Sequence, residues 1–274
     1  MRARRRRFAE EARAERPDLV LLCLLIAAEG DPALDEAGMD AVQIELDELA
    51  GRLPFAPEGG PAAWARNVGE LLGRRLGFGG AAADYRRLES SLLHQVLRRR
   101  RGLPILLSVV WTEVARRAGA PVYGVALPGH FVVGFGDPRG AHVLADPFAG
   151  GRLLSDADAA ELVAGATGAP LEAPMLLPAD PLETVARILN NIRAWAQARP
   201  EHAPVGLWAV DLALLLPGHP ARLRQERGQL LVNCGRFQEG AAELEEYARV
   251  VEAVDAKAAE TVRGRAAEVR SLLN

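Results

Sequence analysis

The chain has 274 residues, of which 49% are hydrophobic and 25% are charged, and its formal net charge is −3 at pH 7. This composition is typical of a soluble globular protein with a large core, and the charge provides no general attraction to nucleic acid or to an anionic membrane. The two cysteines, Cys23 and Cys234, both lie in apolar helical patterns. They indicate buried thiols rather than a disulfide framework, which favours a reducing, cytoplasmic compartment.

The N-terminal region combines a basic run, residues 2–7, with an apolar run, residues 19–28. Acidic residues separate the two runs, and the apolar run is much shorter than the roughly 20 residues of a membrane span. We therefore expect neither a signal peptide nor a membrane anchor. The basic run is expected to form a solvated arm or the start of a first helix.

Apolar periodicity predicts helices in the first third of the chain, over residues 19–29, 41–53 and 62–76. Asp18 is a suitable cap for the first of them, and residues 55–61 are expected to form a loop. The glycines at 77, 79 and 80 end the third helix. They are not expected to bind phosphate, because no strand precedes them and no Lys-Ser/Thr pair follows.

A short helix is predicted over residues 90–98, with Ser90 as its N-cap. Four consecutive arginines, residues 98–101, follow it. They lack interleaved aromatic residues, so a nucleic-acid site is not expected. The run is better explained as a solvated helix end, with one arginine available to pair with an acidic residue near the central site.

The central segment begins with Gly102 and Pro104, which start a helix that runs to about residue 118. This helix is apolar on nearly every side, so it is predicted to be the most buried one. Three strands should follow, over residues 122–126, 131–135 and 141–145. His130 opens the second strand and Asp146 closes the third. A buried helix followed by an antiparallel sheet predicts an α+β core.

Several motifs in this region share a pattern with a known family. They are LGF at residues 76–78, Tyr85, SSLLHQVL at 90–97, RRGLPILLS at 100–108, GVALPGHFVV at 124–133 and DPFAGGRLL at 146–154. Together they resemble the SirB-one family, a transglutaminase-like branch, over roughly the first two-thirds of the chain. The combination of PGHF with DPF.GG at this spacing is specific. Ser90 stands where the family usually has Asn.

The resemblance implies a transglutaminase-like site. In that superfamily a Cys at the N-terminus of the buried helix is the nucleophile, a His on a neighbouring strand takes its proton, and an Asp or Asn orients the His. His130 and Asp146 match the second and third parts, and we expect their side chains to form a hydrogen bond of about 2.7–3.2 Å. The position of the Cys, two residues after Gly102, is occupied by Pro104, which has no nucleophile.

Other residues were considered as replacements for the missing nucleophile. Ser108 lies one turn further along the helix, about 40° around its axis from Pro104, and is the first candidate. Cys23 is a second candidate if the first helix reaches the site. A metal site formed by His130 and His142 with Asp137 or Asp146 is disfavoured, because no tight ligand pair such as H-x-x-x-H occurs. No metal or cofactor is therefore expected.

The C-terminal part is predicted to be entirely helical. Ser155 should cap a helix over residues 155–164, and a Pro/Gly-rich connector follows over residues 165–178. Further helices are predicted over residues 181–199, 204–216, 222–234, 237–251 and 261–273. The pair joined at Gly235 resembles a tetratricopeptide unit, with Gly228 and Ala241 where the helices approach.

We expect three regions: the N-terminal helical part of the core domain (residues 1–80), its transglutaminase-like helix-plus-sheet core (81–175) and the helical, tetratricopeptide-like region (176–274). Two functions follow. One is a binding or regulatory protein that keeps the His–Asp pair without cysteine chemistry. The other is an enzyme acting on amide or peptide bonds through Ser108, His130 and Asp146. The expected partner is a protein or peptide, held by the C-terminal helices unless these only pack on the core, with no role for nucleic acid or membrane.

Overall fold

The computed structural model describes residues 2–54 and 59–271, so most of the predicted loop over residues 55–61 lies outside the described residues. The chain divides into two compact units. The mixed unit comprises residues 18–188, and the helical unit comprises the residues up to 17 together with those from 189 onward. This division falls inside helix α8, C-terminal to the predicted boundary at residue 175.

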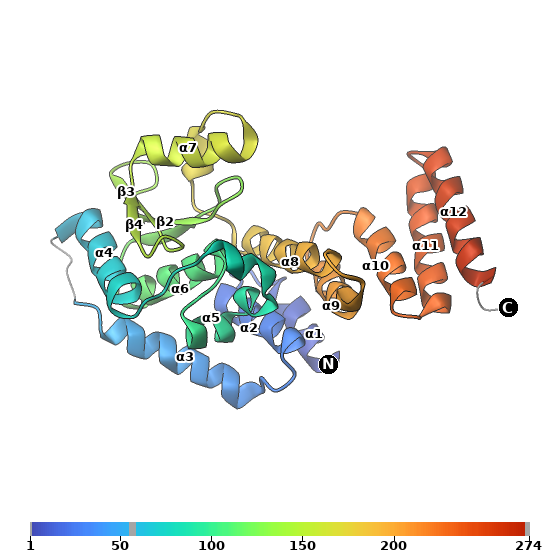
Figure 1. Ribbon diagram of the computed structural model, residues 1–274, viewed down its shortest axis with the longest axis horizontal. Helices are drawn as coiled ribbons and strands as arrows, with labels where there is room; N and C mark the ends of the chain where they lie inside the picture. The colour runs from blue at the N-terminus through green and yellow to red at the C-terminus, as the bar shows by residue number, and fades with distance from the viewer. Residues whose placement is uncertain (1, 55–58, 272–274) are drawn as a thin grey trace. The chain divides into compact units, whose positions relative to one another are not determined.

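In its described residues, the mixed unit contains four α-helices, a buried central helix, four strands, a further helix and the first half of α8 (Figure 1). The α-helices are α2 (Leu19–Gly30), α3 (Glu36–Gly51), α4 (Gly60–Val68), α5 (Leu93–Arg99), α6 (Pro104–Arg117), α7 (Asp156–Thr167) and the first half of α8 (Pro181–Gln197). A π-helical segment, η2 (Gly69–Arg75), continues α4, and short 3-10 turns are η3 (Ala82–Arg86), η4 (Leu88–Ser91) and η5 (Ala173–Leu176). The strands are β1 (Val122–Val125), β2 (Val132–Gly136), β3 (His142–Asp146) and β4 (Arg152–Leu154).

The sheet is antiparallel, with the strands in the order β1-β2-β3-β4. Val125 pairs with Val132 across the first turn, Gly136 with His142 across the second, and Asp146 with Arg152 across the third. The three predicted strands are confirmed. The sequence did not predict β4, because three residues are too few to show the alternation on which strand prediction depends.

Helices cover both faces of the sheet (Figure 1). On one face, Ala159 and Val163 of α7 pack against Val125, Leu144 and Leu154. On the other face lies α6, whose apolar residues are almost all buried. The prediction that α6 is the most buried helix is consistent with its eleven buried positions, the most of any helix in the described residues.

Two local features define the ends of α6. Pro104 occupies the first turn, where its missing N–H would have no intrahelical partner. At the other end Gly119 adopts a φ of 87°, a left-handed conformation that favours glycine and ends the helix. The buried Glu113 is neutralised by Arg116 and Arg117, which both donate hydrogen bonds to it.

Two predictions about local structure were wrong. The helix predicted over residues 62–76 ends at Val68 as an α-helix and continues as the π-helical η2. Ser90 does not cap α5, whose N-cap is Leu92. Instead, the carbonyl oxygen of Ser90 accepts the N–H of Leu103 at 3.0 Å and its hydroxyl accepts from Arg99 at 3.3 Å. These partners hold Ser90 in the 3-10 turn η4, which ends one residue before the cap.

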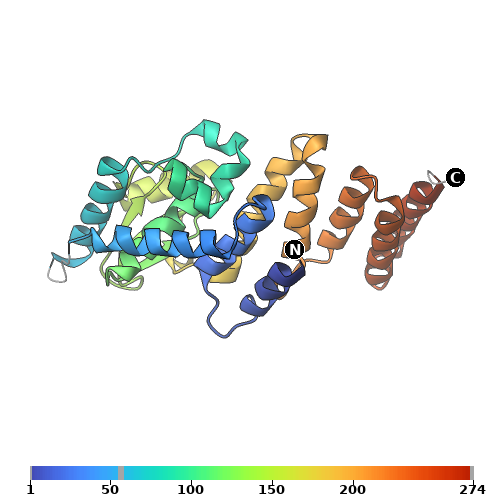
Figure 2. The same ribbon diagram turned by 90° about the horizontal axis from the view of Figure 1, so that it is seen from below.

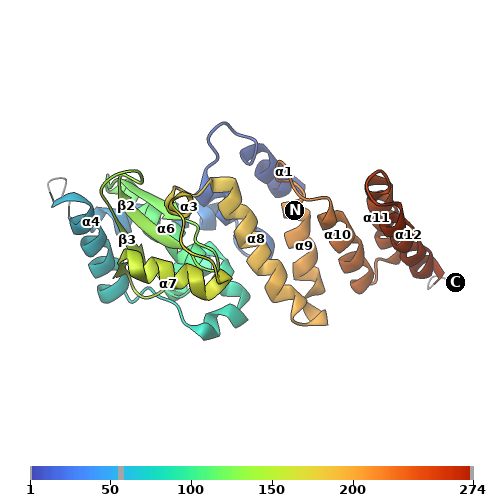
Figure 3. The ribbon, with the colours of Figure 1, turned by 90° about the horizontal axis from the view of Figure 1, so that it is seen from above.

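The helical unit contains α1 (Arg2–Glu11) and the helices from the second half of α8 onward (Figures 2 and 3). They are the 3-10 turn η6 (Pro200–His202), α9 (Ala203–Ala213), α10 (Arg222–Asn233), α11 (Phe237–Glu252) and α12 (Ala256–Ser271). Gly228 of α10 lets α11 approach closely, because a Cβ at Gly228 would lie 2.8 Å from Cγ of Leu244. Ala241 and Leu244 of α11 are buried in a cluster that they share with α12.

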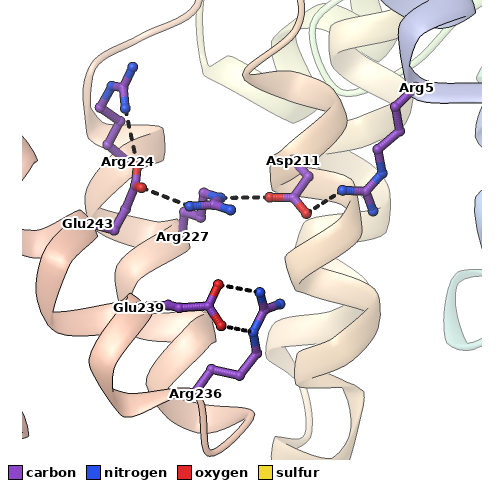
Figure 4. Close-up of polar contacts among 7 residues, drawn as sticks. All are labelled: Arg5, Asp211, Arg224, Arg227, Arg236, Glu239 and Glu243. Atoms are coloured by element: carbon purple, nitrogen blue, oxygen red, sulfur yellow. Dashed lines mark hydrogen bonds and ion pairs between the residues drawn. The ribbon is translucent and has the colours of Figure 1, made fainter. Parts of the chain in front are cut away.

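Ion pairs join α1 to the C-terminal helices of the same unit. Arg5 donates to Asp211 of α9 at 2.6 Å, and Arg227 of α10 donates to the other oxygen of Asp211 at 2.7 Å (Figure 4). Arg227 also donates to Glu243 of α11 at 2.7 Å. The basic N-terminal run is therefore a helix rather than a solvated arm. Within residues 2–54 and 59–271, no helix has both the length and the apolar character needed to cross a membrane.

Candidate functional site

His130 and Asp146 lie together at the end of the sheet. Nε2 of His130 is 3.1 Å from Oδ1 of Asp146, and the two side chains are 13% and 8% exposed. The expected distance is observed, but the expected hydrogen bond is not formed, because the ring nitrogen is not aligned with the carboxylate and Nε2 has no hydrogen-bond partner. The two groups form an ion-pair contact when the imidazole is protonated.

The turn before β2 fixes the position of His130. Gly129 adopts a φ of 71°, and the N–H of His130 donates to the carbonyl of Leu127 at 3.2 Å. Arg187 of α8 fastens this turn, since its Nη2 donates to the carbonyl oxygens of both Leu127 and His130, at 3.0 and 2.9 Å. The Arg187 guanidinium also lies 5.4 Å from the centre of the Phe131 ring, within the range of a cation–π contact.

Asp146 is held by its own chain. Its Oδ1 accepts the N–H of Phe148 at 2.9 Å, and its carbonyl oxygen accepts the N–H of Gly151 at 2.8 Å. These bonds form the turn that leads from β3 into β4. The backbone hydrogen bond fixes the buried carboxylate in place 3.1 Å from the imidazole nitrogen of His130.

Two aromatic rings flank the pair. The Phe148 ring is 6.1 Å from the His130 ring and 6.1 Å from the Tyr85 ring, with edge-to-face geometry in both cases. Tyr85 is 51% exposed, so an aromatic hydroxyl is accessible beside the site. Burial of the phenol and the negative charge of Asp146 both raise the pKa of Tyr85, which keeps it neutral near pH 7.

The four-arginine run supplies partners to a buried carboxylate. Asp84, which is 4% exposed, accepts hydrogen bonds from Arg101 at 2.8 Å and from Arg99 at 3.5 Å. Asp84 is the residue before Tyr85 in the sequence. Two of the four arginines therefore neutralise an acid within the fold, where one such arginine was expected from the sequence.

None of the candidate nucleophiles forms a hydrogen bond with His130 in the described part of the chain. Pro104 is buried at the start of α6. The Ser108 hydroxyl is fully buried and donates to the carbonyl oxygen of Phe131 at 3.2 Å. Cys23 is buried within α2, and burial raises the pKa of its thiol far above the usual value. A hydroxyl engaged with a carbonyl has no base to take its proton.

The second cysteine corrects one expectation. Cys234 does not lie inside a helical core, because it is the C-cap of α10 and is only partly buried. Burial raises the pKa of its thiol, and the nearby Arg236 charge acts in the opposite direction. The helix ends at Gly235, whose φ of 75° turns the chain toward α11, and this leaves the preceding residue at the surface.

The other histidines have separate local partners. Nδ1 of His142 lies 3.0 Å from the carbonyl of Gly140, and Nε2 of His94 lies 2.9 Å from Oδ2 of Asp31. His202 stacks on Trp195 with ring centroids 3.9 Å apart. Across the two described ranges, no group of three or more His, Cys, Asp or Glu side chains is arranged to hold a metal ion.

Sequence reasoning missed Arg187 and Phe148 as components of the site. Phe148 lies within the DPFAGG motif, but nothing in that pattern indicates that its ring packs against His130. Arg187 lies on a helix whose apolar stripe was recognised, and a basic residue next to Ile188 and Leu189 was the available signal. Its role depends on carbonyl groups 57 and 60 residues away in the sequence.

Comparison with known families accounts for both parts of the chain. Residues 40–190 match the family model described as the transglutaminase-like superfamily. The chain belongs to the transglutaminase-like superfamily. Residues 192–274 match the tetratricopeptide repeat model. A transglutaminase-like domain followed by tetratricopeptide repeats is the arrangement expected from the SirB-one resemblance, which is confirmed.

Curated relatives are known from bacteria. A UPF0162 protein of Xylella fastidiosa (strain 9a5c) is 34% identical over 185 residues, and one of Pseudomonas aeruginosa is 36% identical over 184 residues. The chain spans about 65% of the length of each relative. Among solved structures, menin aligns over 97% of this chain and 70% of that chain, with 14% identity. Its TM-score of 0.44 does not establish a shared fold.

Proposed function

We propose that this chain is a non-catalytic transglutaminase-like protein that acts as a binding or regulatory module in the cytoplasm. The proposal rests on one observation: a proline, and not a cysteine, occupies the position of the nucleophile. Pro104 stands at the first turn of α6, where the superfamily's mechanism requires a thiolate. His130 and Asp146 are in contact, at 3.1 Å, but an imidazole–carboxylate pair has only water to activate.

The alternative is an enzyme that acts on amide or peptide bonds through Ser108. This function has less support, because the Ser108 hydroxyl donates to the Phe131 carbonyl and lies within the hydrogen-bonded interior of α6. The backbone N–H groups around it are used within the helix, so an oxyanion hole would have to be supplied by other groups. On this proposal the buried His130–Asp146 pair has a structural role: it joins the end of β3 to the turn before β2.

A protein or peptide is the partner class that the second domain supports. Tetratricopeptide repeats generally mediate protein–protein interaction, and such repeats match residues 192–274. Repeat helices bury a continuous core only by stacking, and they present extended surfaces to partners. We therefore expect the C-terminal helices to contribute to partner binding.

The proposed function is tested by turnover assays with the full chain. Amine incorporation into a glutamine-containing protein and cleavage of peptide and amide substrates should remain at the level of a buffer control. His130→Ala and Ser108→Ala, with Arg139→Gln as an exposed control in the same unit, should give the same baseline. Turnover that is retained in Arg139→Gln and lost in both His130→Ala and Ser108→Ala would overturn the proposal in favour of the enzyme.

A further inference from the structure

A shallow pocket of about 300 Å³ lies on the mixed unit, away from the His130 ring. One wall comes from the end of α4 and from η2, with Arg66, Glu70 and Arg74. The other wall comes from the turn between β3 and β4, with Gly151, Arg152 and Leu153. Residues nearly 80 positions apart in the sequence therefore form one surface hollow.

The pocket is positively charged although the whole chain is net acidic. Its lining contains three arginines and one glutamate. Arg74 is paired with Glu70 at 2.7 Å, and Arg152 is paired at 2.7 Å with Asp158, which lies outside the lining. Arg66 is exposed and has no ion-pair partner within the described ranges. At least one guanidinium is thus available to an incoming anion.

The backbone beneath the pocket is unusual. The segment η2 is a π-helix of seven residues, and π-helical turns occur often at functional sites. It packs directly against the β3–β4 turn, since a Cβ on Gly73 would lie 1.9 Å from the carbonyl oxygen of Gly150. Gly151 has a φ of 85°, and a Cβ there would lie 2.8 Å from Cα of Gly69. Both contacts require glycine.

A buried donor without a partner lies behind the same turn. Trp111 of α6 is fully buried, and its indole Nε1 has no hydrogen-bond partner in the described structure. The nitrogen lies 3.6 Å from the point where a Cβ on Gly151 would be. An unsatisfied buried N–H is costly, so a group at this place calls for a ligand, a water molecule or a small shift of the turn.

We infer that this pocket is a docking site for an acidic peptide segment of a protein partner. The inference rests on the proposed function, because it names the surface and the chemical class of the partner that a binding module would use. Arginine pairs with carboxylates through two parallel hydrogen bonds, and Arg66 is free to do so. The partly exposed Leu153, at 39%, adds an apolar contact beside the charges.

A peptide fits this pocket better than a nucleic acid. No aromatic side chain lines the pocket, so bases have no stacking platform. The carbonyl oxygen of Asp146 accepts the N–H of Gly151, so the turn that forms the pocket wall is the one that holds the partner of His130. An occupied pocket would therefore stabilise the turn on which the His130–Asp146 contact depends.

The test measures binding of a fluorescein-labelled hexaglutamate peptide to the purified full chain by fluorescence anisotropy at low salt. Hexaglutamine, inorganic phosphate and a single-stranded oligonucleotide are the comparison probes. The variants are Arg66→Gln and Arg66→Glu. Arg139→Gln is the matched control, because Arg139 is exposed in the same unit and its removal changes the net charge equally.

Hexaglutamate should bind at least about ten-fold more tightly than hexaglutamine, and added salt should weaken the binding. Arg66→Gln should weaken it about three-fold and Arg66→Glu about ten-fold, whereas Arg139→Gln should stay within two-fold. In a ¹⁵N spectrum, the indole signal of Trp111, assigned with Trp111→Phe, should shift on titration. The indole signals of Trp195 and Trp208, which belong to the helical unit, should not shift.

Equal effects of the Arg66 and Arg139 variants would overturn the inference, as would tighter binding of the oligonucleotide or of phosphate. These results would leave the proposed function intact, since that function fails only through His130-dependent turnover. Conversely, His130-dependent turnover together with normal hexaglutamate binding would contradict the proposed function and still support the docking site. Circular dichroism of each variant establishes that the exposed substitutions leave the fold unchanged.

Discussion

Nη2 of Arg187 donates a hydrogen bond to the carbonyl oxygen of His130 at 2.9 Å. The same nitrogen also donates to the carbonyl of Leu127 at 3.0 Å, so one side chain from α8 holds the turn that presents the imidazole. Burial lowers the pKa of Arg187, but a guanidinium remains charged near neutral pH. A charged donor shared between two carbonyls makes this turn a fixed part of the site.

Replacing Arg187 should therefore destabilise the mixed unit. Arg187→Met removes both hydrogen bonds and leaves two carbonyl groups without their donor, and we expect a loss of about 2–3 kcal/mol in the free energy of unfolding. Arg187→Lys should recover only part of it, because an ammonium lacks the planar guanidinium that lies over the Phe131 ring. Urea titration measures the change, with the exposed Arg199→Gln as the control. An unchanged urea midpoint for Arg187→Met would show that the turn is stable without the hydrogen bonds from Arg187.

The second prediction concerns α6. Val110 is fully buried, so Val110→Asp places an unpaired charge in the core and should cost several kcal/mol, enough to prevent folding. Val110→Ala should cost about 1–3 kcal/mol and leave a folded chain in which the loss can be measured. Thermal unfolding of these variants beside Arg139→Gln, a substitution at an exposed residue of the same unit, gives the comparison. A melting temperature for Val110→Asp within a few degrees of the parent would contradict the central position of α6.

The third prediction concerns pH. Burial raises the pKa of Glu113, but the hydrogen bonds and charges of Arg116 and Arg117 outweigh it and hold that pKa below its usual value of about 4.3. A carboxyl whose pKa is lower in the folded state than in the unfolded state stabilises the fold at pH values above its unfolded-state pKa. This contribution is lost as the pH falls through its folded-state pKa. Glu113→Gln should lower the free energy of unfolding by about 2 kcal/mol at pH 7. The difference in the free energy of unfolding between parent and variant should close below about pH 4.3.

Urea titrations of the parent and Glu113→Gln between pH 7 and pH 3 measure this difference. Arg152→Gln serves as a control, because it removes an exposed ion pair with Asp158 and should change stability by less than about 1 kcal/mol. A difference that stays constant down to pH 3 would mean that the variant acts through packing alone.

The fourth prediction concerns the thiols. Iodoacetamide should modify Cys234 faster than Cys23, because Cys234 is partly exposed at a helix end while Cys23 is buried and its thiol pKa is strongly raised. Both should react more slowly than a free thiol, since the pKa of each is raised by burial. Mass spectrometry of the native and urea-unfolded chain measures the two rates. Rapid labelling of native Cys23 would indicate an activated thiol and would restore it as a candidate nucleophile.

The sequence by itself determined the elements that depend on neighbouring residues. The apolar run after Pro104 predicted the buried helix, and the β-branched and aromatic runs predicted the strands after it. Asp146 closes β3 as predicted, but His130 does not open β2, because it lies in the turn two residues before Val132. The sequence alone also shows that Pro104 occupies the position where the superfamily has its Cys. Local caps were predicted for the same reason: the Asp18 side chain accepts from Leu21 and the Ser155 side chain accepts from Asp158.

Only the tertiary structure decided the features that depend on distant partners. Arg5 pairs with Asp211, 206 residues away, which places α1 with the C-terminal helices instead of with the core. Ser108 donates to Phe131, and no helical pattern states which way a buried hydroxyl points. The π-helix over Gly69–Arg75 packs closely against the β3–β4 turn, and the composition of the segment does not indicate that contact. Periodicity indicates which face of a helix or strand is buried, but the residues that pack against that face depend on the whole tertiary structure.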